Sequence, residues 1–264
     1  MDIKHPGNDV RIHYRFDGPE DAPVLVFSNS LGTSLSMWEP QVSIFARRFR
    51  LLRYDTRGHG LSAVTPGPYS IDQLGRDVLS LLDALGIGKV SFCGLSMGGM
   101  TGMWLGGNAP ERLHRLVVCN TAALIGSPEV WNGRIALVRQ GGMAAIADSV
   151  LQRWFTPSFI ANAPGQIDFV RQMLLQTPAE GYIANCEAIR DMDQRDTISR
   201  ITTPTLVIAG SRDPATPPEE GKFIAAKIAG AKYVELDSAH LSNIEAAKEF
   251  NEALNAGMNS GTAS

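Results

Sequence analysis

The chain has 264 residues, a formal net charge of −3 and 44% hydrophobic residues, which is ordinary for a domain that builds its core without disulfide bonds. This charge argues against a nucleic-acid partner. The chain has three cysteines and no C-x-x-C pair, and Cys93 and Cys119 lie in apolar runs, so we predict reduced thiols. The N-terminus lacks a secretion-signal pattern, and no apolar run approaches the roughly 18 residues of a membrane span, so we expect a cytoplasmic protein without membrane contact.

Strand patterns recur along most of the chain. Residues 10–16 alternate apolar and polar side chains, as a half-exposed edge strand would. A short, wholly apolar run at residues 24–27 predicts a strand that is covered on both faces. Residues 51–54, 90–93, 116–119 and 206–209 are mostly apolar and are interpreted in the same way, and residues 234–236 are the expected last strand.

Helices are expected between these strands. Residues 71–85 have apolar side chains at the 3.6-residue period, with Ser70 as a plausible N-cap and Gly86 after the end. Residues 99–109 are also compatible with a helix. Strands that alternate with helices predict an α/β fold with a mainly parallel, doubly wound sheet.

The alternation stops near Ala122 and resumes near Thr203. The segment between them reads as helical only. We therefore predict a core domain of residues 1–122 and 201–264, with an all-helical cap, residues 123–200, inserted between two strands.

A G-x-S-x-G pentapeptide occupies residues 94–98 and has Ser96 at its centre. It follows a predicted strand and precedes a predicted helix, which is the context of a nucleophile elbow. Glycine is needed on both sides of such a turn because side chains there would collide. The alternative interpretation is a tight turn in which Ser96 has no chemical role.

A nucleophilic serine needs a base and a carboxylate that orients the base. In this fold they follow in the order Ser, acid, His. Of the five histidines, only His240 follows the last predicted strand, and Asp213 follows the strand at 206–209. A surface histidine and a turn-stabilising aspartate are the alternatives, and Asp193 and Asp196 compete less well because they precede that strand.

An oxyanion hole needs two N–H donors that point at the developing charge. We expect the amide of Met97, directly after the serine, to be one of them. The other should lie in the loop after the strand at 24–27, where we choose Leu31. Ser30 would shape this loop or touch the substrate.

Three segments resemble α/β-hydrolases: residues 55–60, residues 94–99 and the loop around Asp213. Two others, residues 29–33 with the Met-Trp pair that follows them and residues 240–245, look like 3-oxoadipate enol-lactonases. The resemblance implies a serine hydrolase that opens an enol-lactone in the breakdown of aromatic compounds such as protocatechuate and catechol. His59 resembles a structural turn residue of the family.

The lactone of the resembled family carries a free carboxylate, so a cation should meet it. No lysine occurs from residue 90 to residue 221, and arginine binds carboxylates in bidentate fashion. Our hypothesis is that Arg134 binds the carboxylate and that Trp131 and Trp154 wall the pocket. A surface arginine or an ion pair within the domain is the alternative for Arg134, and a core role is the alternative for Trp154. No cofactor is expected, since neither metal-ligand spacing nor a phosphate loop is present.

Other functions of the same fold stay open at this point. They are a general carboxylesterase or perhydrolase, a carbon–carbon bond hydrolase, and a non-catalytic ligand-binding homologue. A haloalkane dehalogenase is disfavoured because Ser96 stands where its aspartate nucleophile would be. The sequence also leaves open whether the chain forms a homo-oligomer.

Overall fold

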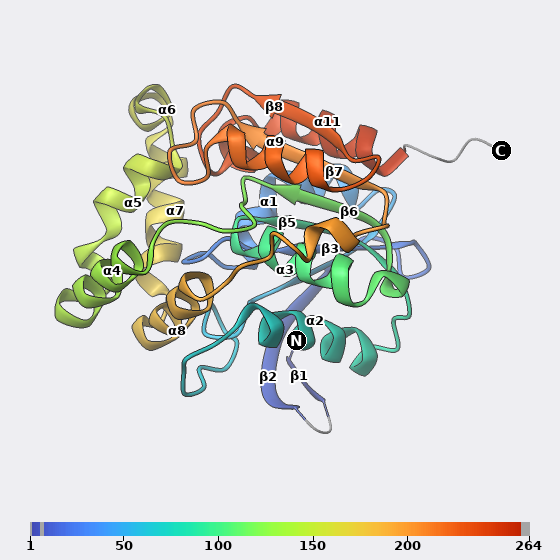
Figure 1. The fold of residues 1–264 in the computed structure, drawn as a ribbon, viewed down its shortest axis with the longest axis horizontal. Helices are drawn as coiled ribbons and strands as arrows, with labels where there is room; N and C mark the ends of the chain where they lie inside the picture. Colours follow the sequence, from blue (N-terminus) through green and yellow to red (C-terminus); the bar gives the residue numbers. More distant parts are fainter. Residues whose placement is uncertain (1, 6–7, 260–264) are drawn as a thin grey trace.

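A computed structural model describes residues 2–5 and 8–259, which form one eight-stranded sheet with helices on both faces (Figure 1). The strand order is β1-β2-β4-β3-β5-β6-β7-β8. The first two pairings, β1 with β2 and β2 with β4, are antiparallel, and the others are parallel. The strands are β1 (Asp2–His5), β2 (Asn8–Asp17), β3 (Val24–Ser28), β4 (Arg50–Tyr54), β5 (Val90–Leu95), β6 (Leu113–Cys119), β7 (Thr205–Gly210) and β8 (Lys232–Leu236).

Helices pack on both sides of this sheet. Leu206 of β7 contacts α11, whereas its neighbours Val207 and Ala209 contact α9, so these two helices lie on opposite faces. The helices of the core are α1 (Glu39–Phe45), α2 (Ile71–Ala84), α3 (Met97–Asn108), α9 (Pro218–Lys227), α10 (Ser242–Glu245) and α11 (Ala247–Asn259). Short 3-10 helices are η1 (Leu35–Trp38), η2 (Pro110–Arg112), η3 (Met143–Ala145) and η4 (Ile198–Arg200).

The strand and helix predictions are confirmed except at the N-terminal edge. Every residue of β5 and β7 is buried, as expected of strands with helices on both faces. Ser70 caps α2, since its side chain accepts a hydrogen bond from the amide of Gln73. The prediction that residues 10–16 form an edge strand is wrong, because β1 pairs outside β2. The strand β1 has only four residues, of which one is apolar, so its sequence has no alternating pattern from which a strand could be predicted.

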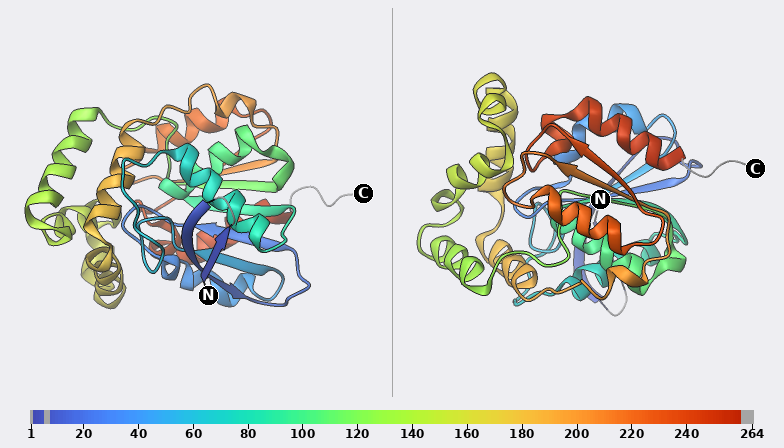
Figure 2. Two further views of the ribbon diagram at one scale, coloured as in Figure 1. Left: turned by 90° about the horizontal axis from the view of Figure 1, so that it is seen from below. Right: turned by 45° about the horizontal axis from the view of Figure 1, so that its top comes forward.

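The segment between β6 and β7 is helical, and Figure 2 shows its helices projecting from one end of the sheet. It holds α4 (Pro128–Gly141), α5 (Ala147–Trp154), α6 (Pro157–Asn162), α7 (Pro164–Gln176) and α8 (Ala179–Arg190). Three of them start at proline, which suits the first helical position. The predicted α/β fold with an inserted helical cap is confirmed, and the exact domain boundaries stay a prediction. Within the described residues, no helix is long and apolar enough to cross a membrane.

Candidate active site

Ser96 lies at the turn between β5 and α3 with φ 57° and ψ −116°, a conformation that non-glycine residues rarely adopt. A Cβ on Gly94 would collide with the carbonyl oxygen of Gly98, and a Cβ on Gly98 would collide with that of Ser28. Glycine is therefore required at both positions. The turn is held by the Ser96 amide, which donates to Cys119 O at 2.8 Å. The N-terminal end of α3, with its free amides, begins directly after Ser96.

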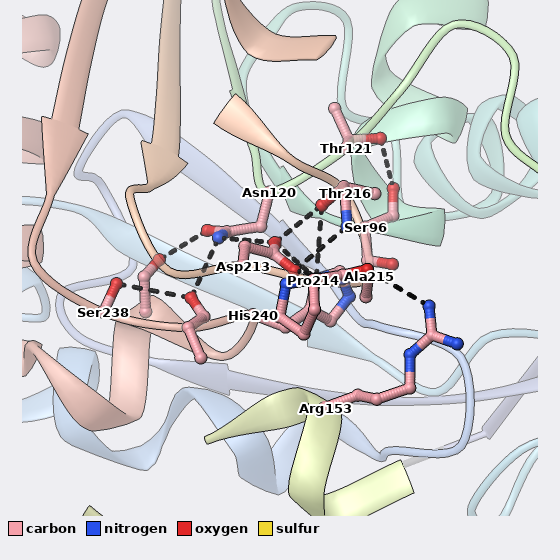
Figure 3. Close-up of polar contacts among 12 residues, drawn as sticks. Ser96, Asn120, Thr121, Arg153, Asp213, Pro214, Ala215, Thr216, Ser238 and His240 are labelled. Carbon is pink, nitrogen blue, oxygen red and sulfur yellow. Dashed lines mark hydrogen bonds and ion pairs between the residues drawn. The ribbon is translucent and has the colours of Figure 1, made fainter. Parts of the chain in front are cut away.

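His240 and Asp213 lie on the loops that follow β8 and β7, and their side chains meet (Figure 3). The distance from His240 Nδ1 to Asp213 Oδ2 is 2.8 Å. Burial alone would raise the pKa of Asp213, but the charge of His240 and the hydrogen bonds from His240 and Thr216 hold the pKa of this carboxyl below its ordinary value. Asp213 therefore stays ionised and orients the imidazole.

Further groups that the sequence analysis missed hold this carboxylate in place. The Thr216 hydroxyl donates to Asp213 Oδ2 at 2.7 Å, and the amides of Ala215 and Thr216 donate to Oδ1 at 2.8 and 3.0 Å. Asn120, directly after β6, donates from Nδ2 to Asp213 Oδ2 at 3.1 Å. Only the position of Asn120 at the end of a predicted strand could have indicated this role.

One cavity of about 290 Å³ brings most of the sequence-predicted residues together. Ser96 and His240 line it, as do Ser30 and Leu31 from the loop after β3. The cap contributes the predicted residues Trp131, Arg134 and Trp154. Met97 and Asp213 do not line the cavity, and both are buried. Neither needs contact with solvent, because Met97 is expected to act through its backbone amide and Asp213 through its hydrogen bond to His240. Among the described residues, no cluster of three or more histidine, cysteine or acidic side chains could hold a metal ion.

Two arginines give the cavity its positive charge. Arg134 stacks over the ring of Trp131, with 4.9 Å between the guanidinium carbon and the ring centroid. Arg153, which the sequence analysis missed, also lines the cavity. Its pKa is lowered, mainly by burial and to a smaller extent by the positive charge of Arg134. Within the described part of the chain, neither arginine forms an ion pair with a carboxylate, while Glu220 contributes one acidic group to the lining.

His59 fixes the loop that carries Leu31. Its Nε2 accepts a hydrogen bond from the Gly32 amide at 2.8 Å, so its proton resides on Nδ1, which faces Arg57 O at 3.4 Å. Asn185 of the cap also donates to Arg57 O, at 2.9 Å. The ring is completely buried, and this burial lowers its pKa to about 4. A turn residue to which the sequence analysis assigned no chemistry thus positions the predicted oxyanion loop.

The neutral state of His59 predicts acid destabilisation. An unfolded histidine takes up a proton near pH 6.5, but folded His59 does so only near pH 4. Between these values the unfolded state binds more protons, so the free energy of unfolding should fall by about 2 kcal/mol between pH 7 and pH 4.5. Urea denaturation at pH 7 and pH 4.5 measures this loss. His59→Gln, which retains an acceptor but does not titrate, should show a flatter dependence, and identical curves would contradict the interpretation.

Two features together define the α/β-hydrolase class. One is the serine at a strand–turn–helix, and the other is the His–Asp pair on later loops of a mainly parallel sheet. The model of the alpha/beta hydrolase fold family matches residues 23–247. The chain therefore belongs to the α/β-hydrolase family, and it is a hydrolase.

Within this family the chain is similar to enol-lactonases, which confirms the resemblance seen in the sequence. 3-Oxoadipate enol-lactonase 2 of Acinetobacter baylyi is 46% identical over 95% of this chain and 94% of its own length. 3-Oxoadipate enol-lactonase 1 of the same organism is 42% identical over 89% and 88%. The crystal structure of the enol-lactonase from Burkholderia xenovorans LB400 superposes with a TM-score of 0.95 at 48% identity, and covers 98% of this chain and 99% of that one.

Proposed function

We propose that the enzyme opens the ring of 3-oxoadipate enol-lactone to give 3-oxoadipate, with Ser96 as nucleophile, His240 as base and Asp213 as the group that orients His240. The observation that carries this proposal is the single cavity in which Ser96 and His240 face two arginines without ion-pair partners among the described residues. The similarity to proteins named 3-oxoadipate enol-lactonase supports the same substrate. A role in the bacterial breakdown of aromatic compounds (protocatechuate or catechol) rests on that resemblance alone.

The first half of the reaction forms an acyl-enzyme. Because Nδ1 of His240 is bound to Asp213, Nε2 is the nitrogen available to take the Ser96 proton. Ser96 Oγ attacks the lactone carbonyl carbon, and the carbonyl oxygen becomes an oxyanion. We assign its stabilisation to the amides of Met97 and Leu31, the first from the start of α3 and the second from the loop held by His59.

The second half releases the product. Collapse of the tetrahedral intermediate breaks the ring C–O bond, and His240 returns the proton to the enolate oxygen that leaves. The resulting enol tautomerises to the 3-oxo acid. Water gives a proton to His240 as it attacks the acyl carbon. Collapse of the second intermediate breaks the bond between the acyl carbon and Ser96 Oγ, which takes the proton back from His240, and the carboxylate product is released.

The two arginines are assigned to the free carboxylate of the substrate. Both line the cavity and their charges repel each other, so a bound anion would relieve this repulsion. The rings of Trp131 and Trp154 supply apolar walls for the lactone. The substrate is thus a small anionic molecule held between the cap and Ser96, and neither a nucleic acid nor a membrane takes part.

Loss of an arginine is expected to weaken binding of charged substrates selectively. A buried hydrogen bond to a charged group contributes about 1.5–3 kcal/mol, which corresponds to an increase of roughly 10- to 100-fold in KM. Arg134→Met and Arg153→Met should raise KM in this way for the enol-lactone but change KM little for p-nitrophenyl acetate, and KM alone is the readout because Arg153 also donates to Pro214 O beside Asp213. Arg139→Met is the matched control, because Arg139 lies on the outer side of α4 and pairs with Glu187. Equal effects on both substrates would overturn the assignment.

A further inference from the structure

The loop that carries His240 is held on both sides of this residue by hydrogen bonds. The amide of Ala239, the preceding residue, donates to Glu245 Oε2 at 2.9 Å. The amide of Leu241, the following residue, donates to Trp154 O at 3.1 Å. The backbone on either side of His240 is therefore held by Glu245 and by a carbonyl group of the cap.

Glu245 is itself bound to the cap. The amide of Thr156 donates to Glu245 Oε1 at 3.2 Å, and the Thr156 hydroxyl donates to the same oxygen. Thr156 precedes α6, two residues after Trp154 at the end of α5. One carboxylate thus accepts hydrogen bonds from the His240 loop on Oε2 and from the cap mainly on Oε1, while the Thr156 amide also lies 3.4 Å from Oε2.

The Asp213 loop is joined to the same part of the cap. Arg153 donates from Nη2 to Pro214 O at 3.3 Å, next to Asp213 (Figure 3). Residues 153–156 therefore contact the loops of both Asp213 and His240. Arg153 and Trp154 also line the cavity, so this short segment touches the substrate space and the catalytic loops together.

We propose that Glu245 is a positioning residue of the reaction, which fixes the His240 loop against Thr156 and so makes the position of the base depend on the cap. The proposal rests on the proposed role of His240. A carboxylate is suited to this place because all its hydrogen bonds are accepted from N–H and O–H donors. A glutamine at position 245 would have only one oxygen that accepts hydrogen bonds. Its NH2 group would take the place of the other oxygen and would face an N–H or O–H donor from which it cannot accept a hydrogen bond.

The test compares Glu245→Gln with the wild type by kcat and KM on p-nitrophenyl acetate and on the enol-lactone. Since a misplacement of about 1 Å can cost 10²-fold in rate, we expect kcat to fall by about 10- to 100-fold on both substrates, with KM within about twofold. The rate of labelling by a fluorophosphonate should fall in parallel. Glu249→Gln, an exposed glutamate of α11, is the matched control and should behave as the wild type.

Thr156 provides an independent variant if Glu245→Gln folds poorly. Thr156→Val removes the hydroxyl and should also lower kcat, whereas Thr156→Ser should restore it. Because Thr156 also caps α6, Ser70→Ala, which removes the cap of α2, controls for a lost helix cap and should leave kcat unchanged. Unchanged kcat in Glu245→Gln, or a loss that only follows the folded fraction, would overturn the proposal. Failure of the wild type on the enol-lactone alone would overturn the proposed substrate and leave this test valid on p-nitrophenyl acetate.

Discussion

Ser96→Ala is expected to lower kcat by about 10⁶-fold, because the variant has no atom that can form the acyl-enzyme. What remains over the uncatalysed rate, roughly 10³-fold, would come from the oxyanion hole and from substrate binding. The fold should be retained, since alanine is smaller and the glycines on either side of residue 96 already permit the turn. The measurement is kcat on p-nitrophenyl acetate, together with covalent labelling by a fluorophosphonate.

A second serine serves as the control for this experiment. Ser91 lies on the same strand, β5, outside the cavity lining, so Ser91→Ala should retain activity and labelling. Loss of labelling only in Ser96→Ala would identify the nucleophile. Normal turnover or normal labelling by Ser96→Ala would refute both the elbow interpretation and the mechanism built on it.

Asp213→Asn should lower kcat by about 10⁴-fold. The carboxylate accepts hydrogen bonds from His240, Thr216 and Asn120, and an amide in its place must present NH2 to one of these donors. An asparagine that donated to His240 Nδ1 would leave the proton on Nε2. The imidazole would then be in the wrong tautomer to take the serine proton.

Asp193 provides the comparison for Asp213, since it was the competing carboxylate in the sequence. It is exposed and pairs with Arg195 at 2.6 Å, away from His240. Asp193→Asn should therefore retain full kcat on p-nitrophenyl acetate. If Asp193→Asn lost activity while Asp213→Asn kept it, the assignment of the orienting carboxylate would be wrong.

Much of the fold could be predicted because its signals are local. Apolar runs mark the buried strands, and the glycines around Ser96 mark a turn that only glycine can flank. Chain order then selected His240 and Asp213, and the structure places the two in contact. By contrast, β1 was missed, because pairing with β2, and not its own pattern, makes it a strand.

The groups that surround Asp213 and His240 could not be predicted, because they are brought in by tertiary packing. Asn120 reaches Asp213 across 93 residues of chain, Glu245 reaches Thr156 across 89, and Arg153 reaches Pro214 across 61. Each is a polar residue of a common type with no distinctive spacing. Only the folded arrangement of the cap over the sheet shows what these side chains contact.

The proposed reaction of this enzyme is the opening of the enol-lactone ring by Ser96. The most direct test generates 3-oxoadipate enol-lactone in situ and follows the loss of its ultraviolet absorbance with the wild type and with Ser96→Ala. We expect fast, saturable hydrolysis by the wild type and none above background by the variant. Turnover of p-nitrophenyl acetate without any acceleration of lactone opening would contradict the claim and indicate a general esterase.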